Sequence, residues 1–200
     1  MAGTPTSGPA GEAGTEPLVF ACAEDLESWL EGQHGVRPDL WLKLAKKSSG
    51  IESVTAAEVV DVALCYGWID GRRESFDAVY YLQRISPRRR GSDWSQVNVR
   101  KIEALTAAGR MREPGLAEVR AAQADGRWAA AYPSQKEATV PDDLAAALAP
   151  GSRAARRFEQ LGRTDRYLVI LQLLRARTPE LRATRLARAV AKLESEQGTG

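Results

Sequence analysis

Apolar residues recur at every second position from Leu40 to Leu44, and this pattern predicts the first of three longer strands, which follows a short strand candidate at residues 18–20. Leu40, Leu42 and Leu44 are expected to share one buried face of the first strand. Two further stretches, residues 68–74 and 79–86, are separated by a short polar link. A β-hairpin is the simplest interpretation of this arrangement.

Apolar residues at a helical period predict helices in the rest of the chain. Thr55 and Glu58 form a capping-box pattern in front of an apolar run that Gly67 is placed to end. Thr178 and Pro179 mark the start of the last helix, as its cap and its first position. Other helices are expected over residues 24–30, 96–108, 116–125, 141–148, 152–161 and 165–176.

These elements predict an α+β fold. A small antiparallel or mixed sheet with helices occupies the N-terminal half, and an all-helical C-terminal half follows. Residues 1–16 lack an apolar period and are rich in Gly, Pro, Ser and Thr, so we expect a disordered tail. Residues 17–95 then form the α+β region, and residues 96–195 form a helical region packed on it as one compact unit.

The composition restricts the compartment and the chemistry. No apolar run approaches the roughly eighteen residues of a membrane span, and the N-terminus lacks the pattern of a secretory signal. We therefore expect a cytoplasmic protein with no membrane insertion. Cys22 and Cys65 have no CxxC or Cys/His spacing, so we expect two reduced thiols, no metal site and no cofactor. The oligomeric state does not follow from the sequence.

Charge is strongly segregated along the chain, although the formal net charge is only +2. Residues 1–71 carry 4 basic and 11 acidic side chains, whereas residues 72–112 carry 10 and 4, and residues 151–200 carry 11 and 5. Arg outnumbers Lys by 22 to 6. An excess of Arg is typical of proteins in which the planar guanidinium binds carboxylate or phosphate, and equally of proteins from a GC-rich genome.

The strand that begins at Trp68 carries aromatic and charged side chains together. Strict alternation places Trp68, Asp70 and Arg72 on one face, a combination that is untypical of a core. In the helix after the arginine cluster, Asn98 lies on the apolar face, and a buried amide requires a hydrogen-bond partner. Ser95 stands at the start of this helix, where free N–H groups favour anions.

These observations predict a pocket for a small anion. Trp68 and Trp94 would form its sides, Asp70 and Asn98 would form hydrogen bonds to the ligand, and Arg84 and Arg88 would clamp the anion between them. Its candidate residues are Trp68, Asp70, Arg84, Arg88, Arg89, Trp94, Ser95 and Asn98. The alternative interpretation is structural: the tryptophans belong to the core, Asp70 pairs with Arg72 or Arg84, and the remaining arginines are solvated. Spacing alone does not separate the two interpretations.

Several stretches resemble the YdeI or OmpD-associated family, also labelled bacteriocin-protection or OmdA proteins. The resemblance runs from about Leu18 to Leu193, in the same order and spacing. It rests on "WLKLAKKSSGIESVTAAEVVDVALCYGWIDGRRESFD", "YYLQRISPRRRGSDWSQVN", "AAGRM", "AQADGRWAAAY" and "VPDDLAAAL". It implies a small cytoplasmic bacterial protein linked by name to porin expression and to tolerance of bacteriocins or cationic antimicrobial peptides. No agreed activity or cofactor comes with the family.

We therefore favour a cytoplasmic anion-binding accessory protein linked to envelope stress. One alternative is an enzyme that uses the pocket of Trp68, Asp70, Arg84 and Asn98, or the only histidine, His34, as a base. The other is nucleic-acid binding through the two basic segments, which the acidic first third of the chain disfavours. We expect an anionic small molecule as the partner and do not expect nucleic acid.

Overall fold

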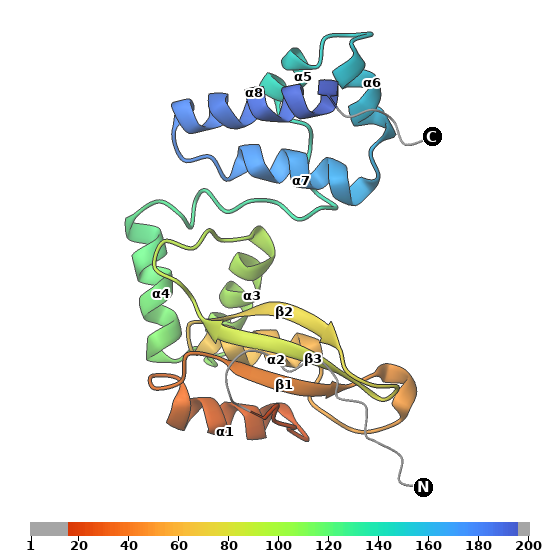
Figure 1. Ribbon diagram of the computed structural model, residues 1–200. Helices are drawn as coiled ribbons and strands as arrows, with labels where there is room; N and C mark the ends of the chain where they lie inside the picture. Colours follow the sequence, from red (N-terminus) through yellow and green to blue (C-terminus); the bar gives the residue numbers. More distant parts are fainter. Residues whose placement is uncertain (1–15, 196–200) are drawn as a thin grey trace, which may run out of the picture. The chain divides into compact units, whose positions relative to one another are not determined.

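The computed structural model describes residues 16–195, and its three strands form the sheet that the alternating pattern predicts (Figure 1). The strands are β1 (Leu40–Ala45), β2 (Trp68–Ser75) and β3 (Tyr80–Pro87), in the order β1-β3-β2 with both pairs antiparallel. The three leucines of β1 are buried, as predicted. The α+β class is thus confirmed, whereas the predicted tail at residues 1–15 lies outside the described residues.

A β-bulge interrupts β2 and changes which side chains share a face. Asp70 lies opposite Ile85, but Arg73 lies opposite Gln83, so β2 contains one extra residue between the two pairs. Residues that lie directly opposite each other point to the same side of a sheet. The bulge therefore brings Arg73, and not Arg72, onto the face of Gln83 and Ile85. The predicted alternation of Trp68, Asp70 and Arg72 is wrong at Arg72.

Two helices pack together beside the sheet. They are α1 (Ala23–Gln33) and α2 (Ala56–Cys65) (Figure 1). The predicted capping box at the start of α2 is confirmed: Thr55 N donates to Glu58 Oε2 over 2.8 Å, and Glu58 N donates to Thr55 Oγ1 over 3.3 Å. Gly67 follows α2 with φ +73°, a left-handed conformation that glycine adopts readily.

Residues 16–195 group into two compact units. The first comprises the chain up to Arg90 together with Ile102–Ala121, and the second comprises Gly91–Lys101 together with the chain from Ala122 onward. Helices α3 (Gln96–Ala107) and α4 (Glu113–Ala124) contribute residues to both units. Helix α4 begins three residues before the predicted start, because Pro114 is tolerated in a first turn. The predicted packing of residues 96–195 on residues 17–95 stays a prediction.

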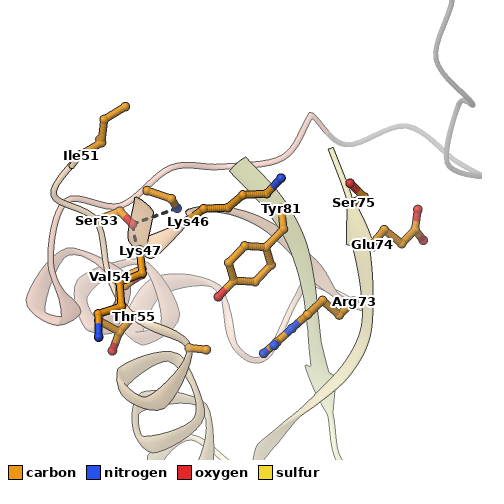
Figure 2. Close-up of a pocket in the computed structure, with 12 residues that line it drawn as sticks. Lys46, Lys47, Ile51, Ser53, Val54, Thr55, Arg73, Glu74, Ser75 and Tyr81 are labelled. Atoms are coloured by element: carbon orange, nitrogen blue, oxygen red, sulfur yellow. Dashed lines mark hydrogen bonds between the residues drawn. The ribbon is translucent and has the colours of Figure 1, made fainter. Parts of the chain in front are cut away.

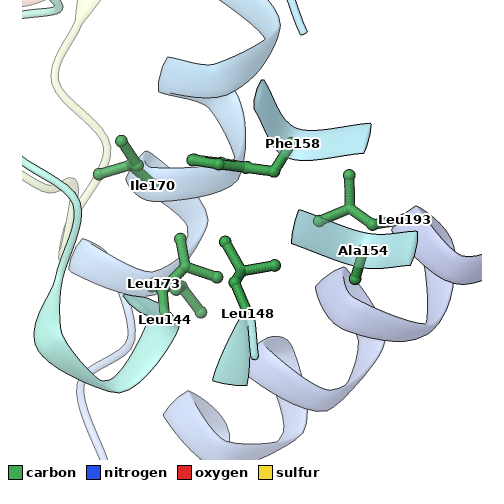
Figure 3. Packing of buried hydrophobic residues seen from close by; sticks show 7 residues of the cluster. All are labelled: Leu144, Leu148, Ala154, Phe158, Ile170, Leu173 and Leu193. Carbon is green, nitrogen blue, oxygen red and sulfur yellow. The ribbon is translucent and has the colours of Figure 1, made fainter. Parts of the chain in front are cut away.

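The second unit has a hydrophobic core of its own. Four helices build it: α5 (Asp142–Ala147), α6 (Arg153–Gln160), α7 (Arg163–Leu174) and α8 (Pro179–Ser195). Thr178 Oγ1 accepts from Leu181 N over 3.2 Å and so caps α8 as predicted. The buried cluster consists of Leu144, Leu148, Ala154, Phe158, Ile170, Leu173 and Leu193 (Figure 3).

Candidate functional site

Five of the eight predicted site residues lie in the first unit. Trp68 is buried, with 1% of its surface exposed, and its Nε1–H donates to His34 O over 3.3 Å. Asp70 is exposed, and Arg84 pairs with Asp39 at 2.6 Å, not with Asp70.

The two remaining residues of this group follow β3. Arg88 is almost completely buried, and its main-chain N donates to Gly67 O over 3.0 Å. Arg89 is exposed. Two adjacent arginines therefore have opposite environments, which their sequence did not distinguish.

The other three predicted residues lie in the second unit. Trp94 is buried, and its ring lies 5.0 Å from that of Trp128. Ser95 Oγ accepts from Asn98 N over 3.2 Å, so Ser95 caps α3 as predicted, and Asn98 is partly buried. The eight residues as one ligand pocket stay a prediction.

In the first unit, a different set of side chains meets in a cleft of about 930 Å³. We call it the Arg73 cleft. It lies between the end of β1, the start of α2 and the paired strands β2 and β3 (Figure 2). Its lining includes three basic residues, three hydroxyl groups and a tyrosine: Lys46, Lys47, Arg73, Ser53, Thr55, Ser75 and Tyr81.

Arg73 is held in place by two neighbours on β3. Its Nε–H donates to Oε1 of Gln83 over 2.9 Å, and its guanidinium carbon lies 4.9 Å from the centre of the Tyr81 ring. Gln83 is itself buried, with 2% exposed, and its Nε2 donates to Gly71 O and Arg84 O over 3.3 and 3.2 Å. Neither terminal nitrogen of Arg73 has a hydrogen-bond partner among residues 16–195.

The remaining charges leave the cleft positive. Lys46 Nζ donates to Asp77 O over 2.6 Å, and Lys47 is exposed. Within the described part of the chain, Glu74 is the one carboxylate that lines the cleft. It pairs at 2.8 Å with Arg72, which does not line the cleft. Three cations therefore face one carboxylate that is already paired, which is an arrangement suited to an anion.

The sequence-based prediction missed Arg73, Gln83 and Tyr81. These three side chains converge only because β2 contains a bulge. Gly71 is the signal that could have revealed the bulge, because an isolated glycine inside a strand often marks one. Without that shift, Arg73 is expected on the opposite face of the strand from Gln83.

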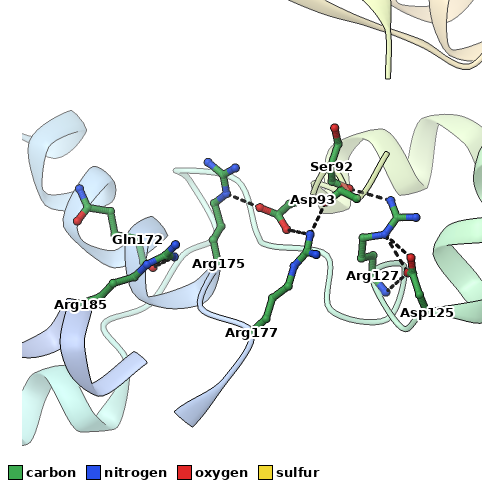
Figure 4. A network of polar contacts seen from close by, with 9 residues as sticks. Ser92, Asp93, Asp125, Arg127, Gln172, Arg175, Arg177 and Arg185 are labelled. Atoms are coloured by element: carbon green, nitrogen blue, oxygen red, sulfur yellow. Dashed lines mark hydrogen bonds and ion pairs between the residues drawn. The ribbon is translucent and has the colours of Figure 1, made fainter. Parts of the chain in front are cut away.

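A second polar cluster lies in the second unit and is almost fully paired (Figure 4). Asp93 accepts from Arg175 Nε and from Arg177 Nη2, both over 2.7 Å. Arg127 donates to Asp125 over 2.7 Å and to Ser92 O over 2.9 Å. These contacts tie residues 92–93 to the start of the loop after α4 and to the link between α7 and α8. A structural role follows from this pairing.

This pairing predicts a pH-dependent contribution from Asp93. Burial raises the pKa of the Asp93 carboxyl, but the hydrogen bonds from Arg177 and Arg175 outweigh it, so the pKa is lowered. The contribution of the Asp93 carboxylate to the free energy of unfolding is fully present above the pKa of about 3.9 that an unfolded Asp has. It is lost as the pH falls through the lower pKa that Asp93 has in the folded protein. Because both arginines are half exposed, we expect Asp93→Asn to lower the free energy of unfolding at pH 7 by about 1–2 kcal/mol.

Urea unfolding of the wild type and Asp93→Asn at pH 7 and pH 3 measures this effect. The difference between the two proteins should be much smaller at pH 3. An equal difference at both pH values would show that the ion pairs do not cause it.

In the first unit, His34 caps a helix and Cys65 is a buried thiol. His34 Nδ1–H donates to Leu30 O over 2.9 Å and thereby caps the end of α1. Cys22 and Cys65 are free, and burial raises the pKa of Cys65 to about 11, so this thiol stays protonated at neutral pH. Among residues 16–195, no three His, Cys, Asp or Glu side chains are placed to hold a metal ion. No helix in that range is long and apolar enough to cross a membrane.

Two family models match separate parts of the chain. Residues 18–118 match a family described as "Domain of unknown function (DUF8412)". Residues 137–196 match one described as "Bacteriocin-protection, YdeI or OmpD-Associated". No curated protein and no solved structure matches the chain.

The resemblance found in the sequence is confirmed at the second of these matches. The stretches quoted between residues 41 and 98, and the Arg73 cleft with them, fall within the first match. Helices α5 to α8 fall within the second. The chain therefore belongs to the DUF8412 family, whose model matches residues 18–118, and its residues 137–196 are similar to the bacteriocin-protection, YdeI or OmpD-associated family.

Proposed function

We propose that this protein binds a small anion in the Arg73 cleft and acts as an accessory protein, not as an enzyme. The observation that carries the proposal is the fixed guanidinium of Arg73. Gln83 and Tyr81 hold it, and its two terminal nitrogens are unpaired within the described residues. A guanidinium with both terminal nitrogens unpaired is suited to bidentate recognition of a carboxylate or phosphate.

The size and charge of the cleft support the same function. Its volume of about 930 Å³ is in the range of small-molecule sites. Lys46 and Lys47 add positive charge beside Arg73, and the hydroxyl of Ser53 adds a polar group. His34 is engaged in capping α1, and the buried Cys65 thiol has a pKa raised to about 11, which favours binding over catalysis in this unit.

We further propose a role in bacteriocin protection, in accordance with the description of the matched family. In this proposal the protein works in the cytoplasm and affects envelope stress tolerance through the anion that it binds. Direct contact with the membrane is not required.

A thermal-unfolding titration with sodium phosphate, against sodium chloride at equal ionic strength, tests the binding site. Phosphate should raise the melting temperature of the wild type, since a ligand that binds the folded state stabilises it. Arg73→Gln should weaken phosphate binding about tenfold or more, because it removes charge-assisted hydrogen bonds.

Two further variants distinguish binding in the Arg73 cleft from a general effect of charge and from binding near Arg84. Arg120→Gln removes the same charge from the exposed face of α4 and should bind phosphate like the wild type. If Arg84→Gln weakens binding and Arg73→Gln does not, the anion binds near the predicted clamp, and the Arg73 cleft is not the site. Absence of a phosphate-specific shift in the wild type would contradict the proposal altogether.

A further inference from the structure

A second hollow, of about 550 Å³, lies entirely within the residues matched to the bacteriocin-protection family. We call it the α6–α8 groove, because residues of α6, α7 and α8 line it. From α7 it is lined by Asp165, Leu168, Val169 and Gln172, which stand at positions i, i+3, i+4 and i+7. Residues at this spacing form one helix face. That face of α7 therefore borders open space.

The floor of the groove is apolar. Leu193 belongs to the buried core of the unit, and Val169 and Leu161 pack against that core. At the edge, Leu168 is 48% exposed. A single exposed leucine is ordinary on a protein surface, but here it continues an apolar lining inside a concave site.

Cations surround this floor. Arg157 on α6 and Arg188 and Lys192 on α8 line the groove, against the single carboxylate of Asp165. The Nε of Arg157 is buried without a hydrogen-bond partner, and neither Arg157 nor Arg188 forms an ion pair within residues 16–195. A buried N–H group is normally satisfied by the protein, by water or by a ligand, so the Nε of Arg157 is available to an acceptor in the groove.

Other arginines in the same unit are paired with carboxylates, although the Nε of Arg166, outside the groove, is also buried without a partner. Arg182 binds Asp143 through two hydrogen bonds of 2.6 and 2.9 Å, and Arg175 binds Asp93 over 2.7 Å. These arginines fix the fold. Arg157 and Arg188 have no such function, and both face the same hollow.

We infer that the α6–α8 groove binds an amphipathic carboxylate, with its aliphatic chain on the floor of Leu161, Val169 and Leu193 and its carboxylate at Arg157 and Arg188. A small hydrophilic anion would gain nothing from the apolar floor. A cationic peptide would be repelled by the excess of positive charge. The inference does not depend on the Arg73 cleft.

Isothermal titration of the full chain with octanoate tests the groove. Octanoate should bind saturably, whereas acetate, which lacks the chain, and octan-1-ol, which lacks the charge, should each bind at least about tenfold more weakly. Equal binding of octanoate and acetate, or no binding of octanoate below its aggregation range, would overturn the inference.

Variants locate the binding. Arg157→Gln should weaken octanoate binding about tenfold, and Arg163→Gln, which removes the same charge from α7 outside the groove, should leave it unchanged. If Arg157→Gln fails to fold, the exposed Arg188→Gln gives the same test. Loss of octanoate binding in Arg73→Gln but not in the groove variants would place the ligand in the Arg73 cleft and refute the groove as the site.

Discussion

Replacement of Gly115 by alanine is expected to lower the free energy of unfolding by about 2–3 kcal/mol. Gly115 lies on α4, where the helix approaches the end of α2. A Cβ atom at this position would lie 2.3 Å from Cys65 O and 2.7 Å from Leu64 O. Both contacts are to backbone, which cannot move aside as a flexible side chain can, so the helices would have to separate.

The sign of this effect distinguishes a steric cause from helix propensity. In an unobstructed helix, replacing glycine by alanine stabilises the protein by about 0.5–1 kcal/mol. Gly32 on α1 offers this control, because nothing lies within 4 Å of a Cβ atom built there. Urea unfolding should therefore shift to lower urea for Gly115→Ala and stay the same or shift to higher urea for Gly32→Ala. If the urea midpoints of Gly115→Ala and Gly32→Ala shifted by similar amounts in the same direction, the close approach of α2 and α4 would be ruled out.

Trp68→Ala is expected to lower the free energy of unfolding by about 3–5 kcal/mol, the range for removing a large buried aromatic side chain. The indole is packed edge-on against Trp29, with ring centres 6.4 Å apart and planes at 89°. Its Nε1–H also donates to His34 O. The variant would lose both contacts and leave a cavity in the first unit.

Trp68→Phe separates packing from ligand binding. Phenylalanine keeps part of the aromatic packing and loses the hydrogen bond, so it should cost clearly less than alanine in urea unfolding. Trp68 does not line the Arg73 cleft, and phosphate affinity in Trp68→Phe should equal that of the wild type. Near-wild-type stability of Trp68→Ala would contradict the structural role, and a fall in phosphate affinity of Trp68→Phe would favour the predicted Trp68–Asn98 pocket.

Features that depend on local sequence were predictable. The capping box of Thr55 and Glu58, the buried leucines of β1 and the cap at Ser95 each depend on a few neighbouring residues, and all three are confirmed. Helix α4 was predicted within one residue at its end and three residues late at its start. Local hydrogen bonding and side-chain periodicity are sufficient to determine such elements.

The Arg73 cleft was not predictable in the same way, because it depends on the pairing of strands. A shift of one residue exchanges the side chains on the two faces of a strand, and a bulge does this part of the way along. Arg84 illustrates the same difficulty: the structural interpretation gave Arg72 or Arg84 as the partner of Asp70, whereas Arg84 pairs with Asp39, 45 residues away in the sequence. Single-sequence patterns do not reveal such distant partners.

The central claim is that Arg73 on the bulged strand β2, held by Gln83 on β3, is the anion-binding group of the first unit. The most direct test follows the Nε–Hε resonance of Arg73 in a nitrogen-15 NMR titration with phosphate, with Arg73→Lys used to assign it. The account predicts a saturable shift of this resonance and of the Tyr81 ring signals, while the Arg84 resonance stays nearly constant. An unchanged Arg73 resonance at phosphate concentrations that raise the melting temperature would contradict the account.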